Sequence, residues 1–325
     1  MPAPPAAWKR LTRNVVPWLV AAVALWWVFH AVKWTALLDA FAQARWLPTF
    51  LGASALLLWV NCAADCMAMS FTFRWFGVRL PYREIFIVRG ATYLLAVIQY
   101  YVGQAAIIGF LHERRGVPGW RAAGFILFIS GINLAVLVVL TAFGLSFGAT
   151  PVAWLRLVPV TVGVGALLYG LVLWLQPAPL KRLQVLAPLF EMGVVGHLKA
   201  LAVRLPHVLV IIAWHYLGLR CFRVDVPLLD ALIYLPAVFF IAALPVSPQG
   251  LGLSQGAAVT FFARYAPGGE EAAVLAYSLA MTGVALMVQV TMGLLFLPAA
   301  RRLGVKGDEG GDDGATAPLA EVSDG

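Results

Sequence analysis

The chain has 325 residues, of which 62% are hydrophobic and only 12% are charged, with a net charge of +8 at pH 7. Soluble domains are about 45–50% apolar and about 25% charged, so this composition excludes a soluble globular fold. The basic excess is typical of membrane-protein loops on one side of the bilayer, and no nucleic-acid partner is expected. The expected fold class is all-α, a polytopic helical bundle in the membrane.

The chain starts with basic residues at Lys9, Arg10 and Arg13, followed by an apolar run over 15–32. This run is long for a secretory signal and no small-x-small cleavage site follows it, which predicts a retained first span. We expect 1–14 to be a cytosolic segment and 15–300 a single polytopic membrane domain. The Gly-rich, acidic residues 301–325 are expected to form a disordered cytosolic tail.

Further full spans are predicted over 47–73, 121–148, 152–175, 198–218 and 270–299. Each run is long enough to cross a hydrocarbon core of about 30 Å at a rise of about 1.5 Å per residue. Residues 34–46 have mixed polarity at helical spacing and are expected to lie along the interface. The sequence therefore predicts about six full spans in a multi-pass protein of the plasma (inner) membrane.

Two apolar stretches contain interruptions that a simple span would not tolerate. The stretch 85–116 is interrupted by Gln99, Gly103 and Gln104, and the stretch 229–265 is broken by Pro245, Pro248, Gly250 and Gly252. Each splits into halves of roughly 10–16 residues, which are too short to span. Irregular backbone at membrane depth survives only where protein or water satisfies it, so both stretches predict re-entrant or broken helical hairpins beside a cavity.

The two stretches also align with each other without gaps. Four positions are identical, namely Gln104/Gln255, Ala106/Ala257, Phe110/Phe261 and Ala122/Ala273. The positive-inside rule favours hairpins that enter from opposite faces, with both chain termini in the cytosol. Together these features predict an inverted repeat, an architecture that transporters use around a midplane substrate site.

The segment PVSPQGLGLSQGA at 245–257 resembles the motif P-x-S-P-G-G-L-G-x-x-E-G-A. That motif is typical of the transmembrane-region family of lysylphosphatidylglycerol synthase, often called flippase-like. Residues 100–133 occupy the place of the family's earlier motif, a P-G-R-x-G-E run followed by a basic loop and a helix bearing E-R and D. The resemblance covers most of residues 10–300 and implies a membrane lipid as the ligand.

This chain departs from the family pattern at its charged positions. Gln104 and Gln255 replace glutamates, Ile129 and Ser130 replace the E-R pair, and Asn133 replaces the aspartate. Amide and hydroxyl groups still hydrogen-bond a head group, but they do not relay protons as carboxylates do. Any coupling to protons or ions that relatives use is therefore in doubt here.

Ionisable residues inside spans are costly and indicate function by default. Asn61 and Asp65 share one face of the second predicted span, and we expect Asp65 to pair with Arg89 in the first hairpin. The alternative is a polar cluster that only packs helices together.

The span around 197–218 carries a cationic stripe. His197, Arg204 and His215 fall within about 20° of one helix face, and His207 lies about 60° from Arg204. Such a stripe would suit a phosphate or pyrophosphate, because a guanidinium matches phosphate oxygens in a planar fork. Alternatively, His197 snorkels to the interface and His215 satisfies a core acceptor. The half-helix that starts near Ser254 would add a second anion-binding feature through its free N–H groups.

The leading hypothesis is a flippase-like lipid transporter that binds an anionic or isoprenoid lipid head group in a central polar cavity. The predicted boundary of this cavity consists of Arg89, Gln104, Arg204, His207 and Gln255. The remaining predicted substrate-binding residues are Asp65, Asn133, His215 and Ser247.

Two alternatives remain open. One is an accessory that presents a lipid intermediate to a partner glycosyltransferase or aminoacyl-lipid synthase. The other is a membrane-embedded transferase using His112, Glu113, Glu270 and Glu271. No catalytic motif is found, so no enzyme activity, cofactor or metal is expected. Cys62 and Cys66 share a helix face but are expected to be buried small residues and not a disulfide or metal pair.

Overall fold

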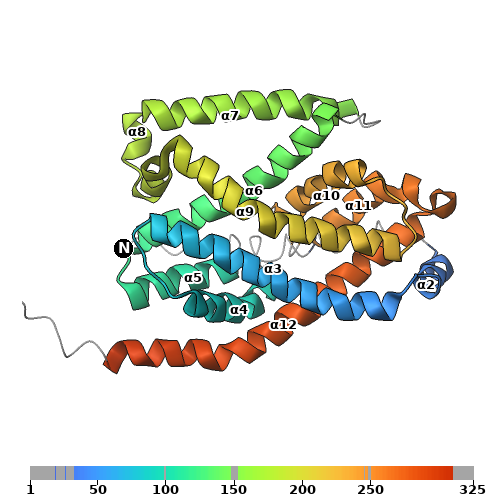
Figure 1. Ribbon diagram of the computed structural model, residues 1–325, viewed down its shortest axis with the longest axis horizontal. Helices are drawn as coiled ribbons and strands as arrows, with labels where there is room; N and C mark the ends of the chain where they lie inside the picture. The colour runs from blue at the N-terminus through green and yellow to red at the C-terminus, as the bar shows by residue number, and fades with distance from the viewer. Residues whose placement is uncertain are drawn as a thin grey trace, which may run out of the picture.

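The computed structural model describes residues 33–98, 100–147, 153–244, 246–247 and 250–309, together with Leu19 and Trp26. All regular structure in these ranges is helical (Figure 1). Apart from Leu19 and Trp26, the predicted first span lies outside the described residues. So do the predicted breaks at Gln99, Pro245 and Pro248 and the end of the acidic tail.

Five described segments are long and apolar enough to cross a membrane. They contain α3 (Leu47–Trp75), α6 (Gly119–Phe147), α7 (Val158–Leu175), α9 (Ala187–Cys221) and α12 (Glu271–Glu309). These helices match the five spans predicted after residue 32, and the largest difference is that α9 begins eleven residues earlier than expected. The short helix α2 (Trp34–Ala42) precedes α3 and packs against α12.

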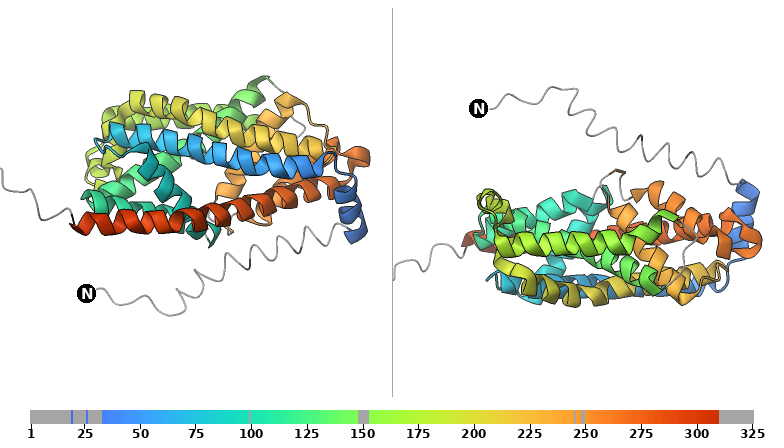
Figure 2. Two further views of the ribbon diagram at one scale, coloured as in Figure 1. Left: turned by 60° about the horizontal axis from the view of Figure 1, so that its bottom comes forward. Right: turned by 90° about the horizontal axis from the view of Figure 1, so that it is seen from above.

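The two interrupted stretches form two helical pairs. The first is α4 (Tyr82–Ile98) with α5 (Tyr100–Arg115), and the second is α10 (Leu228–Ala243) with α11 (Leu253–Phe262). Figures 1 and 2 show the pairs toward opposite ends of the molecule's long axis, between the long helices. The prediction of two broken helical hairpins is therefore confirmed, and the two hairpins lie toward opposite ends of the molecule.

The packing of the two halves follows the expected inverted repeat. In the first half α3 is followed by the α4–α5 hairpin and α6, and in the second half α9 is followed by α10–α11 and α12. Each half's last long helix packs on the other half's hairpin, since α6 lies against α10 and α12 lies against α4. The helices α3 and α9 pack on each other. The two repeats therefore interlock.

A second repeat signal lies just before each hairpin. After α3 the Val78 N–H donates to the Phe73 carbonyl at 2.9 Å, and after α9 the Val224 N–H donates to the Leu219 carbonyl at 2.9 Å. Gly77 and Arg223 occupy the left-handed position of these matching turns, with φ of 79° and 60°. This is the usual way to end a helix and satisfy its last carbonyls.

The corresponding sequences are related by an offset of 146. Identical residues are Phe76/Phe222, Val78/Val224 and Pro81/Pro227. The ungapped alignment that pairs Gln104 with Gln255 has an offset of 151 and misses these identities. The offset differs because the connection between α10 and α11 is longer than the single residue between α4 and α5.

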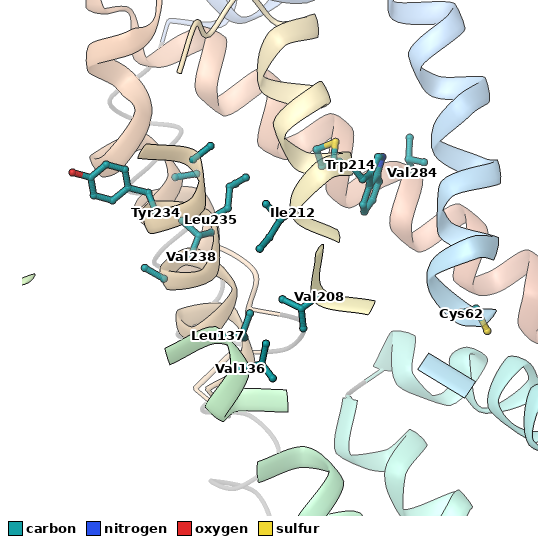
Figure 3. Close-up of a cluster of buried hydrophobic side chains, with 14 of the residues drawn as sticks. Cys62, Val136, Leu137, Val208, Ile212, Trp214, Tyr234, Leu235, Val238 and Val284 are labelled. Carbon is teal, nitrogen blue, oxygen red and sulfur yellow. The ribbon is translucent and has the colours of Figure 1, made fainter. Parts of the chain in front are cut away.

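The apolar core fixes α9 against α10 and α6. Figure 3 shows Val208 and Ile212 of α9 toward Leu235 and Val238 of α10, with Val136 and Leu137 of α6 below them and Trp214 on the other side of α9, next to Val284. Dense apolar packing holds these three helices in register. The positions of the buried polar side chains of α9, Arg204 and His207, depend on this register.

Candidate functional site

A buried ion cluster lies where α3, α4 and α9 meet. Asp65 of α3 is only 1% exposed, and its Oδ2 accepts a hydrogen bond from Arg89 Nε of α4 at 2.6 Å. Its Oδ1 accepts a hydrogen bond from Arg204 Nη1, and Arg204 lies midway along α9. The expected Asp65–Arg89 pair is present, and Arg204 completes a triad.

Polar and aromatic neighbours hold the triad in place. Arg204 Nε donates to Asn133 Oδ1 of α6 at 3.1 Å, and the Arg89 guanidinium lies over the Tyr93 ring, 5.1 Å from its centroid. His207 Nδ1 lies 3.2 Å from the Asn61 carbonyl oxygen. The Asn61 Oδ1 is buried without a partner in the described part of the chain. Four helices therefore converge on one polar centre.

The cluster carries more positive than negative charge. Arg89 and Arg204 are 6% and 5% exposed, and Asp65 is the only buried acidic residue among those described. Two guanidinium groups thus share one carboxylate, which leaves about one unit of positive charge inside the bundle. A buried charge without a counter-charge is costly, so this centre favours an additional anion.

A cavity of about 320 Å³ lies beside this cluster, between α5, α6, α9 and the end of α10. We call it the first cavity. Its polar lining comes from Tyr100, Tyr101, Ser130, Asn133 and Ser247. Asn133 both lines the cavity and receives the hydrogen bond from Arg204, so the cation is one side chain away from the cavity. Ser247 is buried, and its Oγ has no partner among the described residues.

The backbone of the second hairpin explains its glycines. Gly250 has φ of +69°, and a Cβ there would lie 2.7 Å from Ala242 Cα. Gly252 has φ of +80° and precedes the first turn of α11. Only glycine fits a left-handed position against another helix. In the first hairpin, Gly103 lets α5 approach α4, because a Cβ there would lie 3.0 Å from the Thr92 carbonyl oxygen.

The two glutamines that replace the family glutamates have different surroundings. The Gln255 Oε1 accepts the Gly252 N–H at 2.7 Å, and its Nε2 donates to Thr282 Oγ1 at 3.2 Å. Gln255 therefore caps α11 and ties it to α12. Gln104 is also buried, at 5% exposed, but no hydrogen bond joins its amide to another described residue.

The predicted stripe on α9 does not form one site. His197 hydrogen-bonds with Tyr169 Oη of α7 at 2.8 Å, and His215 with Tyr277 Oη of α12 at 2.7 Å. Eighteen residues separate the two histidines, which is about 27 Å along a helix. Arg204 and His207 turn to the central cluster instead, and His215 lines a different, smaller cavity.

The structure thus separates the predicted site residues. None of Arg89, Gln104, Arg204, His207 and Gln255 lines the first cavity, whereas Asn133 and Ser247 do. Their roles in binding stay predictions. Tyr100, Tyr101 and Phe239 also line this cavity and were missed. Gly103 was a predicted break, but it lies inside the continuous helix α5, and the pair Tyr100–Tyr101 at the start of that helix could have indicated two of the three.

The fold and the cluster define a multi-pass helical membrane protein with two opposed helical hairpins and a buried cationic centre. The chain belongs to the lysylphosphatidylglycerol synthase TM region family, whose model matches residues 14–293. This match confirms the resemblance seen in the motif at 245–257. No curated protein matches the chain.

Proposed function

We propose that this protein is a flippase-like lipid transporter, not an enzyme, and that it binds an anionic lipid head group in the first cavity. The observation that carries the proposal is the charge surplus of the Asp65–Arg89–Arg204 cluster beside that cavity. An anionic phosphate entering next to Asn133 would neutralise this surplus. It would also offer acceptors to guanidinium and hydroxyl donors.

Orientation follows the distribution of basic residues. Arg74, Arg115, Lys181 and Arg301 belong to helix ends that lie toward the same end of the long axis (Figure 1). By the positive-inside rule, this end and both termini would face the cytosol of a plasma membrane. In intact cells, an impermeant thiol reagent is expected to label a cysteine introduced at Arg223 but not one introduced at Arg79. The reverse labelling would contradict this orientation.

The function is tested by head-group translocation in proteoliposomes. Arg204→Gln keeps donors for Asp65 and Asn133 but removes the surplus charge, leaving a neutral Asp65–Arg89 pair. We expect the translocation rate of an anionic phospholipid to fall by about tenfold or more. Lys199→Gln removes a charge from the exposed face of the same helix and is expected to leave the rate unchanged.

Two outcomes of the translocation assay would contradict the proposal. Equal rates for wild type and Arg204→Gln would contradict the proposed head-group site. Tight lipid binding by the wild type with no translocation would contradict transport. That second result would favour an accessory that presents a lipid to a partner enzyme.

A further inference from the structure

A second cavity lies next to the first and is also lined by α10. It has a volume of about 170 Å³, is bounded by α9, α10, α11 and α12, and shares only Phe239 and Ala242 with the first cavity. A cavity of about 150 Å³ holds a six-membered ring and one water occupies about 30 Å³, so this space exceeds what a single water needs. The second cavity is therefore large enough for a small organic group.

The lining of this cavity is polar but uncharged. Its hydrogen-bonding residues are His215, Ser254, Tyr277, Ser278, Thr282 and Gln289, and no Asp, Glu, Lys or Arg is among the described residues that line it. Trp214 and Phe239 contribute aromatic walls, with the Phe239 ring centroid 4.7 Å from that of His215. A charged group would find no counter-charge here and would be penalised by desolvation.

The hydrogen bonds within the cavity leave one acceptor unused. The Ser254 hydroxyl donates to the Gly250 carbonyl, which precedes α11, and the Thr282 hydroxyl donates to the Ser278 carbonyl of its own helix. The Tyr277 hydroxyl is shared with His215 Nδ1. By contrast, the Gln289 Oε1 is buried and has no partner in the described part of α12 or its neighbours. A buried acceptor without a partner is energetically costly, so a ligand that donates a hydrogen bond is favoured.

Hydroxyl groups fit this lining better than anions. An ionised carboxylate or a phosphodiester only accepts hydrogen bonds and would leave the Gln289 oxygen unpaired. A hydroxyl donates one hydrogen bond and accepts others, which suits both the Gln289 oxygen and the amide or imidazole donors nearby. We propose that the second cavity binds an uncharged polyhydroxyl group, a glycerol or sugar unit. This inference does not depend on transport or on the Arg204 cluster.

Native mass spectrometry of the purified full chain with two lipids of identical acyl chains tests the proposal. One lipid is monoglucosyl diacylglycerol, which has a sugar and no phosphate, and the other is diacylglycerol. We expect wild type to prefer the glucosyl lipid. Gln289→Leu and Gln289→Met are expected to weaken its binding by about tenfold. Thr291→Val is the matched control, because Thr291 lies exposed on α12 and donates only to the Met287 carbonyl.

The melting temperature separates binding from folding. Gln289→Leu removes a buried unpaired acceptor, so the ligand-free variant is expected to be as stable as wild type or more stable. Free glucose that stabilises wild type but not Gln289→Leu would assign the site to a soluble polyol. Stabilisation only by the glucosyl lipid would assign it to a lipid head group.

Two results would overturn the proposal. One is unchanged glucosyl-lipid binding by both Gln289 variants. The other is a wild type that neither prefers the glucosyl lipid nor is stabilised by glucose through Gln289. Phosphatidic acid, which has a phosphate and no polyol, serves as the control that distinguishes binding in the second cavity from binding in the first. Its binding is expected to depend on Arg204 and not on Gln289.

Discussion

The two hairpins have the same topology but different chemistry. The first hairpin carries a buried charge, since Arg89 of α4 is ion-paired to Asp65. Gly103 allows α5 to pack closely against α4. Within the described residues the second hairpin has no buried charge. Its connection from Leu244 to Gly252 contains left-handed glycines, and α10 lines both cavities.

This difference shows what the repeat preserves. The turns after α3 and α9, the prolines before α4 and α10, and the crosswise packing of α6 and α12 recur in both halves. The buried charges of Asp65 and Arg89 do not recur, although Gln104 and Gln255 occupy matching positions. Asp65 and Arg89 come from the first half and Arg204 from the second, and both halves line the first cavity, so together they would make one asymmetric binding site.

The largest expected effect concerns the charge of the first half. Asp65→Asn would leave Arg89 and Arg204 buried together without a carboxylate. We expect a loss of about 3–5 kcal/mol in unfolding free energy, measured by denaturation in detergent. Asp39→Asn, at an exposed position on α2, is expected to change stability little. Equal effects of the two substitutions would mean that the triad is not a buried charge centre.

The next effect concerns the backbone of the second half. Gly250→Ala adds a Cβ at φ +69° and 2.7 Å from Ala242 Cα, so we expect a loss of about 2–4 kcal/mol. Gly269→Ala is the matched control, because Gly269 has φ of +72° but open space around it. It is expected to lose only about 1–2 kcal/mol from backbone strain. Similar losses at both positions would show that α10 does not pack against the turn.

A smaller effect separates the two repeat-related glutamines. Gln255→Leu removes the cap of α11 and the contact with Thr282, and we expect a loss of about 1–2 kcal/mol. Gln104→Leu is expected to be neutral or stabilising, because the Gln104 amide has no hydrogen bond within the described residues. Thermal unfolding of the two variants side by side would measure this difference, and a reversed order would contradict the assigned roles.

The smallest effect concerns the polar pairs that join the two helices of each hairpin near their outer ends. Tyr265 donates to Asp230 Oδ2 at 2.6 Å, and in the first hairpin Arg115 pairs with Glu84. We expect Tyr265→Phe to lose about 1 kcal/mol and Arg115→Ala about 0.5 kcal/mol, measured by denaturation in detergent. A larger loss for Arg115→Ala would contradict this order.

Tyr265 also makes the stability of the second hairpin depend on pH. Burial, followed by the hydrogen bond to Asp230, raises the pKa of Tyr265, which lies between α11 and α12. Its stabilisation is therefore complete below the unfolded tyrosine pKa of about 10 and is lost as pH rises above it. Tyr265→Phe is expected to remove that alkaline loss, as seen in unfolding measured at increasing pH. An identical loss in the variant would contradict the assignment.

Local sequence features predicted much of the fold. Glycines and prolines within apolar runs located both hairpins, because broken backbone is tolerated only next to protein or water. Spacing on α3 placed Asn61 and Asp65 on one face, and the cost of buried charge predicted the partner Arg89. These features need no knowledge of how distant helices pack.

Features that depend on helix packing were not predicted. Helix periodicity placed His197, Arg204 and His215 on one face but did not reveal that different helices meet that face along its length. Asn133 and Ser247 come from α6 and from the turn after α10, and the first cavity exists because these two segments meet. The longer connection of the second hairpin also hid the repeat at offset 146.

The central claim is that a surplus of buried positive charge beside the first cavity recognises an anionic head group. The most direct measurement is the affinity of the purified protein for phosphatidic acid, by native mass spectrometry, in wild type, Arg204→Gln and Lys199→Gln. The predicted result is a loss of about tenfold or more for Arg204→Gln and no change for Lys199→Gln. Equal affinity in all three proteins would contradict the claim.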